Sequence, residues 1–324
     1  MTALADTIAA QPRLLAGVLE LDLGAQVELL DEAERIWLVG TGTSQHAAEL
    51  GAWLLQTAGR DARAASSAAF VRFGPELRTS DAVVVISHTG ETGFALAARA
   101  KAAADGAGLV SITGQDAGWP EAIETVARET SETYTASYCA ALLTIGRLGS
   151  ALGATGLSEA TLEEIPELVA AAVEAGPPDL SIPERLLVLA GAGPYAVTAR
   201  EGALKLREAA RLPTQGFEAE FLLHGSAVPL DSRDALILLQ PEADPDGLIA
   251  AIAIAARGAG VDVTILEERG EPHPFVAQIP LTVRLQALAS RIAEARSCDP
   301  DTVIAGSWDE EKLWAIGAPR AEAR

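Results

Sequence analysis

The sequence has little positive charge, and it has no long apolar run. Lysine and arginine together number 24 against 45 aspartates and glutamates, so the formal net charge is −21 over 324 residues. This charge repels nucleic acids and anionic membrane surfaces, and neither is expected as a partner. No stretch approaches the roughly 20 apolar residues that cross a bilayer, and the first residues lack the basic segment of a signal peptide. We therefore expect a cytoplasmic protein.

Residues suited to metal or redox chemistry are equally scarce. The two cysteines, Cys139 and Cys298, are isolated, which suits buried thiols in a reducing compartment. The histidines do not have metal-ligand spacing, and we expect His46 to pack or cap a helix and His273 to lie in a surface turn. There is no Walker loop, and Gly40-Thr41-Gly42 lacks the third glycine of a dinucleotide fingerprint. No metal and no cofactor are expected.

What the sequence does contain is a regular alternation of apolar, strand-like runs with alanine-rich helical segments. This alternation predicts an α/β fold, in which parallel sheets are covered by helices on both faces and ligand loops lie at the carboxyl ends of the strands. The expected strands are 36–39, 82–86 and 108–112, then 186–190, 235–239 and 261–265, and the main expected helices are 3–19, 45–58, 94–104, 162–174, 196–210 and 247–257.

The second set of segments repeats the order of the first at an offset of 150 residues, measured from Ile36 to Leu186. We interpret this as an internal repeat of two doubly wound, flavodoxin-like domains. Gly176-Pro177-Pro178-Asp179 cannot continue the preceding helix and is the expected linker. The expected organisation is an N-terminal helical segment (1–30), a first domain (31–175), a second domain (176–296) and a tail (297–324).

The segment 87–92 follows an expected strand and precedes an expected helix. The hydroxyls of Ser87, Thr89 and Thr92, the small Gly90 and the N–H groups of the first helical turn are typical of a loop that holds a phosphate. The loop contains no lysine or arginine. The same residues would also serve as an N-cap that only ends the strand, so the segment alone leaves both interpretations open.

A second polar pattern consists of Glu201, Lys205 and Glu208, which share one face of an expected helix. On a surface, they would form a ladder of ion pairs worth a few tenths of a kcal/mol each. In a site, they would place a cation between two carboxylates, one of which could transfer a proton. The spacing does not decide between the two.

Three motifs together resemble the double SIS (sugar isomerase) proteins. They are the loop 40–44, the segment 87–92, and the block 199–208 followed sixteen residues later by His224-Gly225. The resemblance covers most of the chain. It is strongest to the isomerase half of glucosamine-6-phosphate synthase and to stand-alone amino-sugar-phosphate deaminases and deglycases.

The resemblance implies a role for each motif. Glu208 would shuttle a proton between C1 and C2 of an open-chain sugar phosphate, with Lys205 beside it. His224 would assist ring opening, reaching in from the partner subunit of a homodimer with shared active sites. The residues implied in phosphate and sugar binding are Gly42, Thr43, Ser44, Ser87, His88, Thr89 and Thr92.

Some positions depart from the family pattern. His88 replaces the glutamine of a Ser-Gln-Ser-Gly loop, and it would either contact a sugar hydroxyl or cap the helix. The Pro-Arg and lysine of the family's tail are absent after Pro300, so either Lys312 substitutes or no residue does. Thr2 stands where a glutaminase would carry its cysteine nucleophile, and we expect no glutaminase activity.

The sequence therefore predicts a phosphosugar isomerase or amino-sugar-phosphate deaminase that acts on a hexose 6-phosphate by enolisation at C1/C2. The alternative is a non-catalytic regulatory protein that binds a sugar phosphate or amino-sugar phosphate. Retention of Glu208 and His224 favours the enzyme, and loss of the tail pattern favours the regulator.

Overall fold

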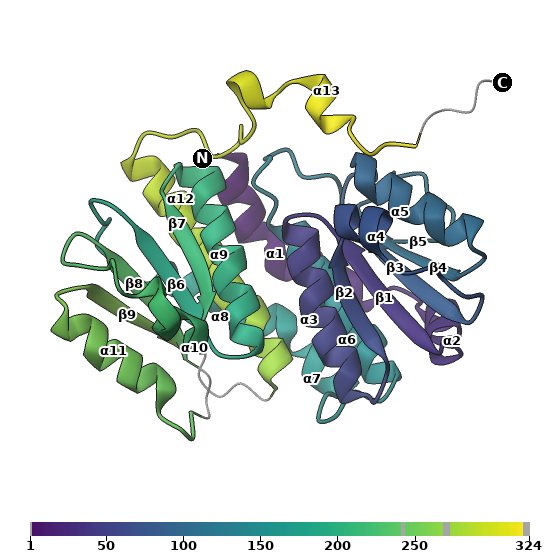
Figure 1. Cartoon of the computed structure of the whole chain (residues 1–324), viewed down its shortest axis with the longest axis horizontal. Helices are drawn as coiled ribbons and strands as arrows, with labels where there is room; N and C mark the ends of the chain where they lie inside the picture. Colours follow the sequence, from purple (N-terminus) through teal and green to yellow (C-terminus); the bar gives the residue numbers. More distant parts are fainter. Residues whose placement is uncertain (1, 241–243, 268–272, 320–324) are drawn as a thin grey trace. The chain divides into compact units, whose positions relative to one another are not determined.

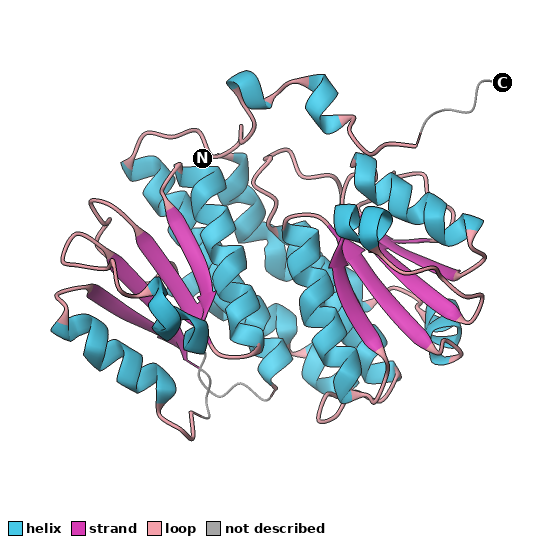
Figure 2. Cartoon of the chain, in the orientation of Figure 1, coloured by secondary structure: helices cyan, strands magenta, loops and turns pink. Residues whose placement is uncertain are grey.

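The computed structural model describes residues 2–240, 244–267 and 273–319. Its described residues form two parallel β-sheets with helices packed against them, as Figures 1 and 2 show. The predicted α/β class is thereby confirmed. In the described ranges, no helix combines the length and apolar character needed to cross a membrane.

The first sheet has five parallel strands in the order β2-β1-β3-β4-β5. This 2-1-3-4-5 order is that of flavodoxin-like folds. The strands are β1 (Arg35–Gly40), β2 (Ala62–Ser66), β3 (Asp81–Ile86), β4 (Gly108–Thr113) and β5 (Ala122–Glu124), and the helices of this part of the chain are α2 (Gly24–Asp31), α3 (Thr43–Thr57), α4 (Ser67–Phe73), α5 (Gly93–Ala104), α6 (Ala136–Ala151) and α7 (Glu159–Glu163).

The second sheet has four parallel strands in the order β7-β6-β8-β9, which matches the order of the first four strands of the other sheet. Its strands are β6 (Leu187–Gly191), β7 (Thr214–Glu218), β8 (Ala235–Gln240) and β9 (Asp262–Glu267). The remaining helices are α1 (Ala3–Leu19), α8 (Ile165–Ala175), α9 (Pro194–Ala210), α10 (Ala219–Phe221), the π-turn η1 (Leu222–Ser226), α11 (Leu248–Gly258), α12 (Pro274–Ala295), the 3₁₀ turn η2 (Gly306–Trp308) and α13 (Glu311–Trp314).

The central strand β3 is buried along its whole length. Val83 and Val85 pack with Phe70 of α4 and with the alanines of α5. Because helices cover parallel strands on both faces, the sequences of such strands are almost continuously apolar. These apolar runs made the strands predictable from the sequence.

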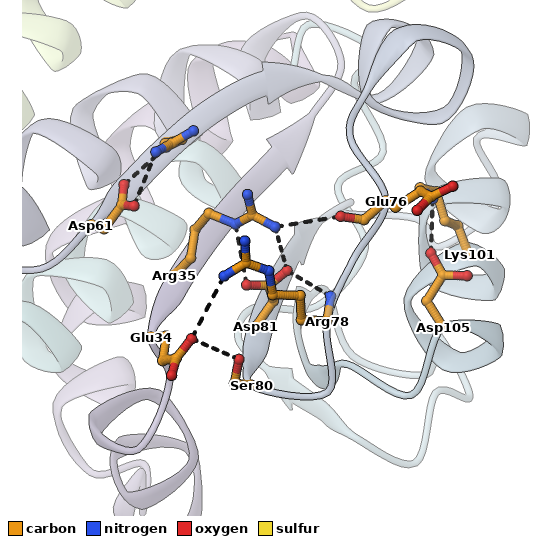
Figure 3. A network of polar contacts seen from close by, with 10 residues as sticks. Glu34, Arg35, Asp61, Glu76, Arg78, Ser80, Asp81, Lys101 and Asp105 are labelled. Atoms are coloured by element: carbon orange, nitrogen blue, oxygen red, sulfur yellow. Dashed lines mark hydrogen bonds and ion pairs between the residues drawn. The ribbon is translucent and has the colours of Figure 1, made fainter.

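The amino ends of the two sheets are held by matching ion pairs. In Figure 3, Arg35 at the start of β1 binds Asp81 at the start of β3 through Nε and Nη2, at 3.1 and 2.5 Å. In the second sheet, Arg185 binds Asp234 in the same way, just before β6 and β8. These pairs fix the amino edges and leave the loops at the carboxyl edges to carry ligands.

The chain forms two compact units. The first-sheet unit comprises Arg13–Glu129, Ala136–Glu163 and Ile304–Arg324; the second-sheet unit comprises Met1–Pro12, Thr130–Thr135 and Glu164–Val303. Helix α8 belongs to the second-sheet unit, where it packs on α12. With the domain boundary expected at 176–179, the chain would pass from one domain to the other only once. This boundary stays a prediction.

One histidine differs from expectation. His273 is 7% exposed rather than in a surface turn. Its Nδ1 accepts a hydrogen bond from the Phe275 N–H at 3.1 Å, and it thereby caps the start of α12. The neighbouring Pro272 lies outside the described residues.

Candidate functional site

The loops after β1 and β6 have the same glycine geometry. Gly42 and Gly193 precede α3 and α9 with φ values of +58° and +55°, which glycine adopts without strain. A Cβ on Gly40 would lie 2.4 Å from the backbone of Ser44, so the chain must turn tightly there. The result is that Thr43 and Ser44 enter the first turn of α3 directly at the carboxyl end of β1.

The segment 87–92 leaves β3, the strand that pairs with β1. Both strands run in the same direction, so their carboxyl ends meet at one edge of the first sheet. This edge brings together the residues predicted to bind phosphate and sugar: Gly42, Thr43, Ser44, Ser87, His88, Thr89 and Thr92.

The start of α5 has no capping hydrogen bond from its N-cap side chain. Thr92 is its N-cap residue, and the Thr92 side chain makes no capping hydrogen bond. At the corresponding place after β8, by contrast, the carboxylate of Asp244 accepts hydrogen bonds from Leu248 N and Ile249 N of α11, both at 3.1 Å. The N-terminus of α11 is already neutralised by the protein, so α5 is the better anion site of the two.

Two contacts tie the loop 87–92 to residues 128 and 129. His88 Nε2 accepts a hydrogen bond from the Glu129 N–H at 3.2 Å. Glu91 receives two hydrogen bonds from the guanidinium of Arg128, both at 2.8 Å. The Glu129 carboxylate in turn accepts hydrogen bonds from Ala136 N and Ser137 N at the start of α6.

His88 accepts a hydrogen bond through Nε2, and this requires that nitrogen to be unprotonated. Burial of the ring lowers the pKa of His88. The Glu129 carboxylate opposes this shift, and the positive charge of Arg128 adds to it. The imidazole is therefore kept neutral where it supports the loop.

Arg128 and Glu129 were not predicted from the sequence. They follow the short strand β5 in no recognisable motif, and their loop partners lie 37 and 41 positions away in the chain. Because the contacts depend on how the chain folds back after β4, a local pattern could not have identified them.

Glu201 and Lys205 are buried on α9, and Glu208 is half-buried. Lys205 Nζ lies 2.6 Å from Glu208 Oε2 and 3.5 Å from Glu201 Oε1. The side chains of Glu201 and Lys205 are 0% and 1% exposed, and that of Glu208 is 21% exposed. The interpretation as a surface ladder is therefore wrong, because α9 packs against both the second sheet and α12.

Opposing effects act on the protonation of Glu208. Burial raises the pKa of Glu208 above the usual range, and attraction to Lys205 only partly offsets that rise. A raised carboxyl pKa is common among groups that transfer protons in enzymes.

His224 lies on η1, where Gly225 has a φ of +106° and bends the backbone. Its side chain is 72% exposed, and Nε2 lies 3.6 Å from Oε1 of Glu220. Among the described residues, the polar contact of His224 is thus to Glu220 and not to Glu208. Exposed apolar side chains surround it in the sequence: Phe221, Leu223 and Val228.

The C-terminal tail lies against the start of α5. The backbone of Trp314, Ile316 and Ala318 comes within 3.4 Å of the point where a Cβ on Gly93 would stand. Lys312 is exposed on α13, two residues before this contact. The tail thus carries Lys312 close to the loop 87–92 within the first-sheet unit.

Residues 29–136 match the SIS domain family. Over 305 residues, the chain is 26% identical to a glutamine–fructose-6-phosphate aminotransferase (isomerizing) of Pyrococcus horikoshii, and the match covers 85% of this chain and 51% of that protein. Over 334 residues, it is 25% identical to a Thermus thermophilus protein of the same name, with 92% and 55% covered. The chain spans about half the length of these curated relatives.

Solved structures share the fold over almost the whole chain. The C-terminal domain of glucosamine-fructose-6-phosphate aminotransferase from Francisella tularensis superposes with a TM-score of 0.81 at 19% identity, covering 93% of this chain and 98% of that one. Tagatose-6-phosphate ketose/aldose isomerase from Escherichia coli gives 0.78 at 18% identity, with 95% and 97% covered. Glucosamine-6-phosphate deaminase from Thermotoga maritima gives 0.77 at 18%, with 93% and 97% covered. Residues 29–136 thus match the SIS domain family, and the chain is similar to glutamine–fructose-6-phosphate aminotransferases (isomerizing) in sequence and to the C-terminal domain of such an enzyme in fold.

Proposed function

We propose that the protein is an enzyme that binds a hexose 6-phosphate and moves a proton between C1 and C2 of its open-chain form. The reaction is either an aldose–ketose isomerisation or the deamination of an amino-sugar phosphate. The observation that carries this proposal is the buried Glu201–Lys205–Glu208 group, in which one carboxyl group is partly exposed and has a raised pKa.

Glu208 is the proposed base. Enolisation needs a single carboxylate that removes a proton from one carbon and returns it to the next on the same face of the sugar. Lys205 holds Glu208 at 2.6 Å, and Glu201 balances the lysine from its other side. The side chain of Glu208 is thereby fixed in direction while its pKa stays above the usual range.

The loop 87–92 is the proposed phosphate site, together with Gly42, Thr43 and Ser44 from the neighbouring strand. Hydroxyl groups and the uncapped start of α5 supply its hydrogen-bond donors. The names of the proteins with this fold agree with such a substrate, since they include a tagatose-6-phosphate isomerase and a glucosamine-6-phosphate deaminase. These two names also represent the two reactions between which the proposal leaves a choice.

The active enzyme is proposed to be a homodimer in which His224 serves the partner's site. His224 is exposed, and the exposed apolar side chains beside it (Phe221, Leu223 and Val228) would be covered in a dimer interface. Lys312 is the proposed tail residue over the sugar, because the tail seats on Gly93 at the start of α5.

The chain is also proposed to contain two SIS domains, at 31–175 and 176–296, related by an internal repeat. Three similarities support this: the shared strand order, the paired glycine loops, and the equivalent ion pairs Arg35–Asp81 and Arg185–Asp234. In each pair the aspartate also accepts a backbone N–H from the residue three positions before it, Arg78 in one case and Asp231 in the other.

Ligand-dependent melting temperatures test the phosphate site. Fructose 6-phosphate and glucosamine 6-phosphate should raise the melting temperature, because a ligand that binds only the folded state stabilises it, whereas fructose and glucosamine should not. A Ser87→Ala/Thr89→Ala variant should lose the shift. Ser80→Ala, which removes a hydroxyl from the opposite edge of the same sheet (Figure 3), should keep it. Equal shifts from phosphorylated and plain sugars would contradict the assignment.

A further inference from the structure

The proposed phosphate loop contains a carboxylate and no cation of its own. Glu91 lies within the segment 87–92, and its negative charge adds to a chain with a net charge of −21. A dianionic phosphate at this place would be repelled unless a nearby positive charge compensated for Glu91 and for the net negative charge of the chain. The guanidinium of Arg128, which donates to both oxygens of Glu91, can supply that charge.

The two basic side chains of α5 itself are engaged elsewhere. Lys101 Nζ binds Asp105 at 2.8 Å at the far end of the helix. Arg99 donates to both carboxylate oxygens of Glu121 and lies over the ring of Trp119. Of these basic residues, Arg128 is the one paired with a residue of the loop itself.

The Arg128–Glu91 pair is suited to exchange. The two side chains are 58% and 64% exposed, and exposed ion pairs contribute little to stability. A phosphate group presents the same two-oxygen edge to a guanidinium as a carboxylate does, and it carries more charge. The neighbouring Glu129 N–H donates to His88 Nε2, and this contact keeps residue 128 beside the loop.

We infer that Arg128 is the cation of the phosphate site: without ligand its guanidinium pairs with Glu91, and an incoming phosphate takes over its hydrogen bonds. This inference rests on the proposed function, because it assigns a partner to the phosphate at that same site. No covalent step is involved. Arg128 binds the phosphate, and Glu91 competes with the phosphate for the guanidinium.

A purely structural role for the ion pair makes a different prediction. If the pair only clamped the loop, removing either partner would loosen the loop and weaken phosphate binding alike. If Arg128 binds phosphate, the two removals have opposite effects. Arg128→Gln removes the cation, whereas Glu91→Gln removes a competing negative charge and leaves the cation.

Titration calorimetry with fructose 6-phosphate and with inorganic phosphate distinguishes phosphate binding by Arg128 from a purely structural role of the ion pair. It is done on the full chain at low salt. Arg128→Gln should weaken binding of both probes about tenfold or more, as loss of a charge-assisted hydrogen bond does. Glu91→Gln should tighten binding by about fivefold, because one unit charge a few ångströms from the ligand is removed. Arg63→Gln is the matched control, since Arg63 forms a similarly exposed pair with Asp61 at the amino edge of the same sheet, and it should change binding less than about twofold.

Two results would overturn the inference while leaving the proposed function intact. They are wild-type affinity in Arg128→Gln, and equal weakening in Arg128→Gln and Glu91→Gln. Failure of the wild-type protein to bind fructose 6-phosphate or inorganic phosphate would instead overturn the proposed phosphate site and the inference with it.

Discussion

His88 shows how a single side chain supports the candidate loop. Its Nε2 accepts from Glu129 N, and its ring packs so closely on Gly114 that a Cβ there would lie 2.6 Å from the imidazole. The charges of Arg128 and Glu129 also act on the pKa of His88, but the lowering caused by burial is larger than either effect. Protonation would remove the acceptor and add a charge beside Arg128.

His88 should therefore make the folded state sensitive to acid. Because its pKa is lowered on folding, the unfolded chain binds the proton more readily, and stability falls as pH drops below the unfolded value of about 6.5. His88→Gln keeps an acceptor that does not titrate. Urea unfolding from roughly pH 7.5 to pH 5 should show a shallower loss of stability in the variant, with a difference in slope of up to about 1.4 kcal/mol per pH unit. Parallel curves for the two proteins would show that His88 does not titrate in this range.

For single residues, the sequence predicted the chemical groups of the candidate site better than it predicted their surroundings in the fold. The spacing of Glu201, Lys205 and Glu208 correctly placed the three on one helix face, but burial of that face depends on α12, from a distant part of the chain. The polar character of the loop 87–92 was visible in the sequence, whereas its attachment to Arg128 and Glu129 was not. Contacts between distant segments leave no local pattern that could reveal them.

Two glycines set how closely the central helices approach their sheets. A Cβ on Gly51 of α3 would lie 2.6 Å from Leu38 of β1, and a Cβ on Gly202 of α9 would lie 2.9 Å from Leu189 of β6. Gly202 is also next to Glu201, so this contact positions the proposed catalytic group on the second sheet.

Alanine at either position should crowd the leucine side chains packed there, which for Gly202 include Leu285 of α12 at 2.6 Å. Gly51→Ala and Gly202→Ala should each lower the free energy of unfolding by about 1–3 kcal/mol, the usual cost of overpacking. Gly17→Ala is the matched control, because it also lies in a helix but has no atom within 4 Å of the added Cβ. That variant should be more stable by up to about 1 kcal/mol, as alanine favours helix. Chemical denaturation measures all three, and stabilisation by Gly51→Ala would contradict the packing account.

Several elements could be predicted from the sequence, and others could not. The central strands of both sheets are apolar runs, and the helix at 3–19 was predicted with the bounds it has as α1. The strands β2, β5 and β7 were not predicted, because they lie at sheet edges and consist of short segments with few β-branched residues. The long helix α12 contains Pro280, a residue that argues against a helix interior when only the sequence is read.

For the whole molecule, the central issue is whether one chain makes a complete active site. Glu208 is half-buried on α9, whereas His224 is exposed on η1 and lies beside Glu220. A homodimer in which each subunit lends His224 to its partner reconciles these positions with a role for both residues in one reaction.

Mixed dimers test this arrangement. Glu208→Gln and His224→Ala subunits should each be inactive alone, since each lacks one required group. After mixing and subunit exchange, activity should return in the heterodimers, because one of their two sites then carries both intact residues. Size-exclusion chromatography should show a dimer. If His224 serves its own subunit, mixing will restore nothing, and a monomeric protein would exclude sharing altogether.

Exchange of sugar hydrogen with solvent tests enolisation most directly, and it separates an enzyme from a regulatory protein that only binds. Enolisation removes a proton from C2 of the aldose or C1 of the ketose, so reaction in deuterated water should place deuterium at these carbons. NMR or mass spectrometry of fructose 6-phosphate and glucosamine 6-phosphate detects the label. Binding without turnover leaves no label.

If the wild-type protein enolises its substrate, deuterium should appear in at least one of these sugar phosphates. Glu208→Gln keeps the size of the side chain but cannot accept the proton, so it should slow exchange by a factor on the order of 10² or more while the melting-temperature shift with the sugar phosphate is retained. Absence of deuterium from both sugars despite binding would contradict enolisation and favour a regulatory protein. Exchange by Glu208→Gln at the wild-type rate would show that Glu208 is not the base.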